Sequence, residues 1–399
     1  MRQGYKFNRL EMAGSLGDLG TLLPLAVGMI LINGLKPTGL FLTLGIFYVL
    51  AGIYFGVTVP VQPMKVISAY AIATAMDASQ ITAAGYLMGL VLLLIGITGA
   101  VTVIGKTIPK AVVRGVQLST GILLMVQGVK LMLGTSILQK IHQAVEPYLW
   151  VQSVGPIPIG IIIGGAGTFL TLFLLANKRF PAGLIVVVAG LALGLLLGNR
   201  QGLDELRIGI HLPSFLPFGW PTQADFTFAL FALVLPQIPM TVGNAVIAYT
   251  DLSESYFKEQ SNKVTYRSAT ISMALANFLS STFGGMPLCH GAGGLAAHYR
   301  FGARTAGSNI MIGGIFIVLA FLLGDRSLAI INLLPLAVLG ILLLFAGGEL
   351  CLTILDLNTR KDLFVSLVIL GITLATNLAA GFIVGIAVAY LLKYGKLSV

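Results

Sequence analysis

The stretch Val57-Thr58-Val59-Pro60-Val61-Gln62-Pro63-Met64-Lys65 decides the fold, because it interrupts an apolar chain with two prolines three residues apart. Proline has no amide hydrogen and disrupts helix interiors, whereas β-branched residues favour extended backbone. We therefore expect extended chain before Pro63 and a helix that begins there, with Lys65 in its first turn. Free N–H groups at such a helix start attract anions, and Lys65 would add a full positive charge.

A second interruption, Gly284-Gly285-Met286-Pro287-Leu288-Cys289-His290-Gly291-Ala292-Gly293-Gly294, is expected to be the pseudosymmetric partner of the first. Its glycines leave backbone amides accessible to a ligand. His290 could donate to an oxyanion or relay a proton, but a lone His is as often a satisfied buried donor. Adjacent residues rarely orient as nucleophile and base, so Cys289 beside His290 is weak support for an enzyme. No second cluster of Cys and His completes a metal site.

The composition is that of a membrane protein. Of 399 residues, 57% are hydrophobic and only 10% are charged, and the mean hydropathy is +0.95. A soluble domain of this size needs a far more charged surface. The net charge of +10 is scattered among apolar runs instead of gathered with aromatic residues, so it favours the lipid bilayer over nucleic acid as a partner.

Apolar runs of roughly 20 residues can cross a bilayer, and we expect an all-α polytopic protein with fourteen segments, several of them short. The segments are 11–33, 38–56, 60–76, 81–104, 109–133, 157–176, 182–198, 226–250, 265–283, 287–299, 304–324, 328–355, 363–378 and 379–392. This count places seventeen of the 24 Lys and Arg residues on the side of the termini and five on the other, which predicts cytoplasmic termini. Two seven-span halves, 1–205 and 206–399, would form inverted repeats.

Polar residues in the first and eighth spans could complete a site. They are Asp18 and Thr21 in the first span, and Gln237, Thr241 and Asn244 in the eighth. The last three are spaced four and three apart and share one helical face. That face could line a cavity or pack between helices, which is the commoner use of such residues in membranes. Lys65 is costly in a membrane unless it is paired or hydrated, so it either serves an anion, pairs with a carboxylate such as Asp18, or does both.

Three blocks of sequence resemble the molybdate transporter family related to the SulP sulfate permeases. They are Gly17-Asp18-Leu19-Gly20-Thr21, Pro60-x-Gln62-Pro63-Met64-Lys65, and Pro287-x-Cys289-His290-Gly291-Ala292-Gly293-Gly294 followed by Tyr299-Arg300-Phe301-Gly302-Ala303-Arg304. The resemblance implies a fold similar to the uracil permeases, with a core of segments 1–4 and 8–11 and a gate of segments 5–7 and 12–14. Substrate would bind between the starts of segments 3 and 10. SulP permeases typically append a cytoplasmic regulatory domain, which this sequence does not show, so the molybdate branch is favoured.

The leading hypothesis is a secondary transporter that imports molybdate by elevator-like alternating access, without a cofactor or metal. The candidate substrate-binding residues are Lys65, Gln62, Met64, Thr21, Gln237, Thr241, Asn244, Cys289, His290, Gly291 and Gly293, and the coupling candidates are Asp18 and His290. Tungstate and sulfate share the shape and charge of molybdate. The alternatives are a bicarbonate or nucleobase carrier, a passive anion channel, and a membrane-embedded enzyme. A bacterial inner membrane is expected, and the sequence leaves open a coupling proton or cation and a homodimer.

Overall fold

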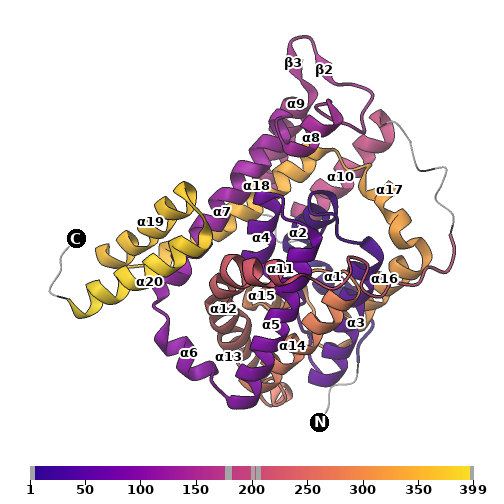
Figure 1. The fold of residues 1–399 in the computed structure, drawn as a ribbon. Coiled ribbons are helices and arrows are strands. Elements are labelled where there is room, and N and C mark those ends of the chain that lie inside the picture. The colour runs from indigo at the N-terminus through magenta and orange to yellow at the C-terminus, as the bar shows by residue number, and fades with distance from the viewer. Residues whose placement is uncertain (1–4, 176–181, 199–202, 204–207, 396–399) are drawn as a thin grey trace.

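The computed structural model describes residues 5–175, 182–198, 203 and 208–395, and most of them are helical (Figure 1). The helices of the first half are α1 (Arg9–Leu16), α2 (Leu19–Leu31), α3 (Pro37–Phe55), α4 (Lys65–Thr74), α5 (Ala78–Thr98), α6 (Val101–Thr107), α7 (Lys110–Leu133), α8 (Ile137–His142), α9 (Ile159–Leu175) and α10 (Ala182–Leu197). Those of the second half are α11 (Gln223–Ala229), α12 (Leu235–Met240), α13 (Tyr249–Phe257), α14 (Tyr266–Thr282), α15 (Ala292–Phe301), α16 (Gly307–Leu323), α17 (Ser327–Ile331), α18 (Leu336–Leu352), α19 (Arg360–Ala375) and α20 (Leu378–Tyr394).

Short irregular elements connect these helices. Two π-helical stretches, Leu230–Val234 and Thr241–Ala248, join α11, α12 and α13 into one continuous helix. Strand β1 (Gln62–Pro63) pairs antiparallel with β4 (Leu288–Cys289), and β2 (Ser153–Val154) forms a hairpin with β3 (Ile157–Pro158). The β1–β4 pair joins segments more than 200 residues apart in the sequence, so it fixes the two interruptions against each other.

Helix length and composition agree with an integral membrane protein. Six helical stretches of the described chain are long and apolar enough to cross a bilayer. Helices α1 and α2, bent by 48° at a short break, pass the same test together. Helices α9, α10 and α20 are apolar but shorter.

Most helices overlap the ranges predicted for the spans, and several of the differences have local causes. The helix after the first interruption begins at Lys65 rather than at Pro63, because Pro63 is held extended in β1. The predicted first span is broken beside Asp18. The predicted segment 328–355 is also two helices, since proline disfavours the interior of a helix and Pro335 instead precedes α18.

Close helix packing depends on glycines at the crossing points. Helix α7 packs along α18, and α19 and α20 lie together on the far side of α7 (Figure 1). At the α7–α18 crossing, a Cβ atom on Gly128 would lie 2.5 Å from the carbonyl oxygen of Gly340, and one on Gly340 would lie 2.5 Å from that of Gly128. A larger residue at either position would push the helices apart.

A buried carboxylate holds the start of α18. Glu146, in the loop after α8, accepts hydrogen bonds from the amides of Ala337 at 2.7 Å and Leu336 at 2.8 Å. Its side chain lies outside the spanning helices and is almost fully buried. Burial raises the pKa of this carboxyl to about 7, although the two hydrogen bonds favour the charged form.

Candidate functional site

The centre of the molecule is the crossing of the two interruptions. Gln62 pairs with Cys289 and Pro63 with Leu288. The amide of Met64 then donates to the carbonyl of Pro287 at 2.9 Å. Helix α4 starts two residues after β1, and α15 starts three residues after β4. Two helix N-termini, with their partial positive charges, therefore lie close to one short sheet inside the protein.

Two asparagines hold the extended segments in place. Asn277 of α14 donates to the carbonyl of Leu288 at 2.8 Å and accepts from the amide of Leu288 at 3.1 Å. Asn309 of α16 does the same for Val59, accepting from its amide at 2.8 Å and donating to its carbonyl at 2.7 Å. Each side-chain amide thus acts as a neighbouring strand would. The sequence interpretation missed both residues. An Asn within an apolar segment was the available signal for each, and the structure shows that both are fully buried.

The start of α4 is closed by Gln237. Its Oε1 atom accepts hydrogen bonds from the amides of Val66 at 2.9 Å and Ile67 at 3.2 Å, and its Nε2 atom donates to the hydroxyl of Thr241 at 2.9 Å. These bonds satisfy two of the donors that a helix start leaves free. Gln237 and Thr241 therefore share a helical face as predicted, but in this conformation they serve α4.

The start of α15 is open. Its N-cap residue, Gly291, makes no side-chain capping bond, and no acceptor among the described residues binds the amides of Ala292, Gly293 or Gly294. A Cβ atom built on Gly293 would meet nothing within 4 Å, whereas one on Gly291 would lie 2.1 Å from Gln62 Oε1 and 3.7 Å from Asn244 Nδ2. The structure thus brings Gly291, Gln62 and Asn244 together beside three free amide donors.

The charged groups of the site are close but not paired. Lys65 is partly buried, and it makes no hydrogen bond or ion pair with the described residues. Asp18 accepts from Gln62 Nε2 at 2.6 Å and is near enough to Lys65 to interact with it through space. Asp18 Oδ2 and Gln62 Oε1 are buried without a partner among the described residues. Thr21, one turn further along α2, is partly buried near Asp18 and donates its amide to the Asp18 carbonyl at 3.0 Å.

His290 is held in a network of its own. Its Nδ1 atom lies 3.0 Å from the carbonyl oxygen of Pro60, and its Nε2 atom lies 2.8 Å from the hydroxyl of Ser272. A carbonyl can only accept, so Nδ1 carries a proton, while Nε2 shares a hydrogen bond with Ser272, whose hydroxyl also lies 2.9 Å from the carbonyl oxygen of Ala269. The ring is fully buried and packs against Phe47, Phe55 and Tyr249. Both nitrogens are thus already engaged in this conformation.

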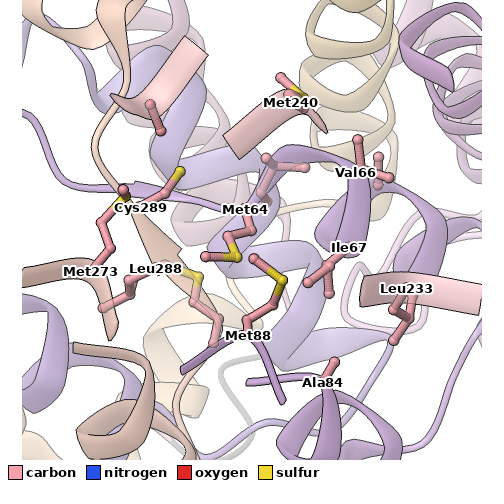
Figure 2. Close-up of a cluster of buried hydrophobic side chains, with 14 of the residues drawn as sticks. Met64, Val66, Ile67, Ala84, Met88, Leu233, Met240, Met273, Leu288 and Cys289 are labelled. Carbon is pink, nitrogen blue, oxygen red and sulfur yellow. The ribbon is translucent and has the colours of Figure 1, made fainter. Parts of the chain in front are cut away.

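Cys289 and Met64 present their side chains to apolar surroundings. The thiol of Cys289 donates to the carbonyl of Pro63 at 3.7 Å and makes no hydrogen bond to His290 among the described residues, so the two are not arranged as nucleophile and base. Met64 is fully buried in the cluster that also contains Met88 and Leu288 (Figure 2). Its amide is used by Pro287, so Met64 has no free donor in this conformation.

The described residues contain no group of three or more His, Cys, Asp or Glu side chains that could hold a metal ion. What the geometry offers instead is a set of hydrogen-bond donors without acceptors. The three amides of α15 and the ammonium of Lys65 make up this set, and the carboxylate beside them is Asp18, whose Oδ2 atom would lie 2.6 Å from a Cβ built on Gly294. Such an arrangement suits an anion.

Comparison with known proteins identifies related sequences over nearly the whole chain. The family described as "Molybdate transporter of MFS superfamily" matches residues 10–124 and 229–350. Molybdate transporter 2 of Arabidopsis thaliana is 32% identical, covering 97% of this chain and 88% of its own length. Molybdate transporter 1 of Chlamydomonas reinhardtii is 30% identical, covering 94% and 90%.

The structure is similar to those of anion transporters. The transmembrane domain of the cyanobacterial bicarbonate transporter BicA matches with a TM-score of 0.67 at 16% identity, over 99% of both chains. Murine Slc26a9, an anion transporter in the inward-facing state, matches with a TM-score of 0.65 at 15% identity, over 98% of this chain and 69% of its own. The predicted relation of the fold to SulP permeases is confirmed.

Proposed function

We propose that this chain is a secondary transporter importing a tetrahedral oxyanion, because it belongs to the molybdate transporter family and shares the fold of known anion transporters. Molybdate is the first candidate, with tungstate and sulfate as close analogues. The family and the fold support anion transport across a membrane. The choice of molybdate rests on the names of the relatives, and the residues below are assigned from the geometry of this chain.

The open start of α15 carries the proposal. An oxyanion must lose hydration water to enter a protein, and it does so only if fixed donors replace the lost hydrogen bonds. The amides of Ala292, Gly293 and Gly294 are preorganised for this role, and Lys65 supplies a full positive charge from the facing helix. An uncharged nucleobase has no need of a lysine that the protein leaves unpaired.

The other candidates fall into supporting roles in this proposal. Asn244 and Gly291 border the open amides, and Gln62 and Thr21 form the polar wall on the side of Asp18. Gln237 and Thr241 hold the start of α4 and so position Lys65. His290, Cys289 and Met64 shape the crossing by packing and by bonds to backbone carbonyls.

Asp18 is the better candidate for a coupling proton. Binding a dianion beside a buried carboxylate brings like charges together, which favours protonation of the carboxylate. The unpartnered Oδ2 atom of Asp18 is where that proton would be held. His290 is the weaker candidate, because both of its ring nitrogens already have partners. On this basis the transporter couples oxyanion uptake to proton entry.

We further propose fourteen segments in two inverted repeats, 1–205 and 206–399, with a core that moves against a gate. The packing supports this arrangement, since α3 lies against α16 and α5 against α14, as two related halves would require. We also propose a bacterial inner membrane as the location; the excess of Lys and Arg on the side of the termini supports cytoplasmic termini.

Oxyanion binding by the purified protein tests the assignment. Titration calorimetry with molybdate, tungstate and sulfate should show binding that Lys65→Met weakens about ten- to hundredfold, because a hydrogen bond to a charged group contributes about 1.5–3 kcal/mol. Bicarbonate and uracil are the competitors that test the other carriers. Unchanged oxyanion affinity in Lys65→Met would overturn the site.

Accumulation in proteoliposomes tests the mechanism. An imposed proton gradient should drive molybdate uptake above the external concentration, and Asp18→Asn should abolish the effect of the gradient while exchange of molybdate continues. Equilibration without accumulation in the wild type would indicate a passive channel instead.

A further inference from the structure

A cavity of about 1330 Å³ lies where α3 and α13 end, outside the proposed transport site. Its wall is built from the last residues of α3, the turn after α13, the N-terminal segment at residues 5 and 6, and Arg304 between α15 and α16. The N-terminal segment is part of this wall, so the cavity lies at the end of the molecule that holds the N-terminus. None of the residues that line it is a candidate for oxyanion binding.

The cavity carries a strong excess of positive charge. Four cationic side chains line it, and Glu259 is the acidic residue among the lining residues; the four are Lys6, Lys258, Lys263 and Arg304. None of the four forms an ion pair within the described part of the chain. The acids at the end of α13, Asp251 and Glu254, line a neighbouring cavity instead. Lys258 and Glu259 line both cavities, so Lys6, Lys263 and Arg304 make up the excess of positive charge in this one.

Arg304 is fixed without the help of a carboxylate. Its guanidinium carbon lies 3.5 Å from the centre of the Tyr299 ring, which stacks on Tyr256 at 4.0 Å, and Nη1 donates to the carbonyls of Tyr299 and Ala303. Buried Glu11 is close by, but its oxygens accept from the amides of Arg304 and Thr305. The Glu11 carboxylate thus binds backbone amides, and the charge of the Arg304 guanidinium remains available to the cavity.

The cavity borders an exposed apolar surface on α3, a helix long and apolar enough to cross a bilayer. Ile53 lines it and is half exposed, as are its neighbours Leu50 and Tyr54 on the last turns of α3. Lys263 lies 5.4 Å from the centre of the Tyr54 ring. Tyrosine and lysine in this arrangement are typical of the membrane interface. An occupant could place a phosphate among the cations and an acyl chain along Ile53.

We propose that this cavity binds the phosphate of an anionic phospholipid headgroup. Lys6, Lys263 and Arg304 hold the phosphate, while the acyl chains lie on the exposed face of α3. Arg304 follows α15, whose other end forms the open amides of the transport site. A lipid seated here therefore holds the helix that carries the proposed substrate donors. The proposal does not depend on which anion is transported.

Binding of a tail-labelled short-chain phosphatidylglycerol to the purified full chain, measured by fluorescence polarisation in detergent, tests this site. The double variant Lys6→Gln/Lys263→Gln should weaken binding about 30-fold, because each lysine near an anionic lipid contributes roughly a factor of five. Lys140→Gln, an exposed lysine in α8, is the matched control and should bind as the wild type does. The double variant should keep its fold, because Lys6 contributes only its backbone amide to the bond with Thr305. Thermal unfolding checks this.

Two competitors identify the ligand. Phosphatidylcholine, which has no net charge, should displace the probe at least tenfold less effectively than unlabelled phosphatidylglycerol. Inorganic phosphate should not displace it at equal concentration. Equal binding by the double variant, or equal competition by phosphatidylcholine, overturns the phosphate site. Displacement by inorganic phosphate overturns the lipid assignment in favour of a soluble phosphate.

Discussion

Replacing Asn277 by leucine should damage the site without touching the substrate. Leucine branches at Cγ as asparagine does, but it is bulkier and its side chain makes no hydrogen bond. The substitution therefore removes the donor to the Leu288 carbonyl at 2.8 Å and the acceptor for the Leu288 amide at 3.1 Å. Both backbone groups are buried, so water does not replace the lost partner.

The expected cost follows from those two groups. A buried polar group left without a partner costs about 1–3 kcal/mol, so Asn277→Leu should cost about 2–6 kcal/mol. This is a large part of the roughly 5–15 kcal/mol that stabilises a typical domain. Part of the cost is avoided if β4 moves to find other partners, but the open amides of α15 begin three residues after β4 and would move with it.

Thermal unfolding in detergent and molybdate calorimetry measure the two effects. The unfolding midpoint should fall by several degrees, and molybdate affinity should fall at least tenfold, since about 1.4 kcal/mol corresponds to a factor of ten. Gln223→Leu, which replaces an exposed glutamine whose side chain makes no hydrogen bond with the described residues, is the control. If Asn277→Leu unfolds and binds molybdate as the wild type does, the position of β4 does not depend on this side chain.

Three further predictions test other contacts. Gln237→Glu keeps an acceptor for the amides at the start of α4 but adds a negative charge. The unfolding midpoint should therefore be unchanged, while oxyanion affinity falls at least tenfold. An unchanged affinity in calorimetry would contradict the placement of the anion. Gly128→Ala should destabilise the protein by about 1–3 kcal/mol through overpacking at the α7–α18 crossing, whereas Gly348→Ala, which meets nothing within 4 Å, should not. Because the pKa of Glu146 is raised to about 7, the folded protein keeps a proton that the unfolded chain releases, so stability should fall by up to about 3 kcal/mol between pH 4.5 and 7. Glu146→Gln should remove that slope in unfolding experiments, and an unchanged slope would assign it to another group.

The helices themselves were readable from the sequence because their signals are local. Apolar runs, prolines and glycines mark where a helix can lie and where it must stop, and α3, α7 and α14 lie within a few residues of their predicted ranges. The two interruptions were found for the same reason. The start of α4 was placed two residues too early, because a proline also suits the first helical turn and only the pairing of Pro63 with Leu288 decides between the alternatives.

Contacts between distant segments were not readable in this way. No local pattern relates the residues that pair between β1 and β4, or those joined by the side-chain hydrogen bonds of Asn277 and Asn309. A polar residue in an apolar helix signals that a partner exists but does not name it. The break beside Asp18 was missed because the chain there has no proline, and Gly17 alone is a weak breaker.

The two helix starts also turned out to be unequal, and this changes the chemistry of the site. Symmetric interruptions suggest two equivalent anion-binding ends, each with its own free amides. The structure instead satisfies the amides of Val66 and Ile67 with Gln237 and leaves those of α15 open. An anion would then be bound by backbone donors on one side and by the Lys65 charge on the other. Charge without fixed geometry selects for a dianion, and fixed amides select for its shape, so the two halves of the site would contribute different parts of the specificity.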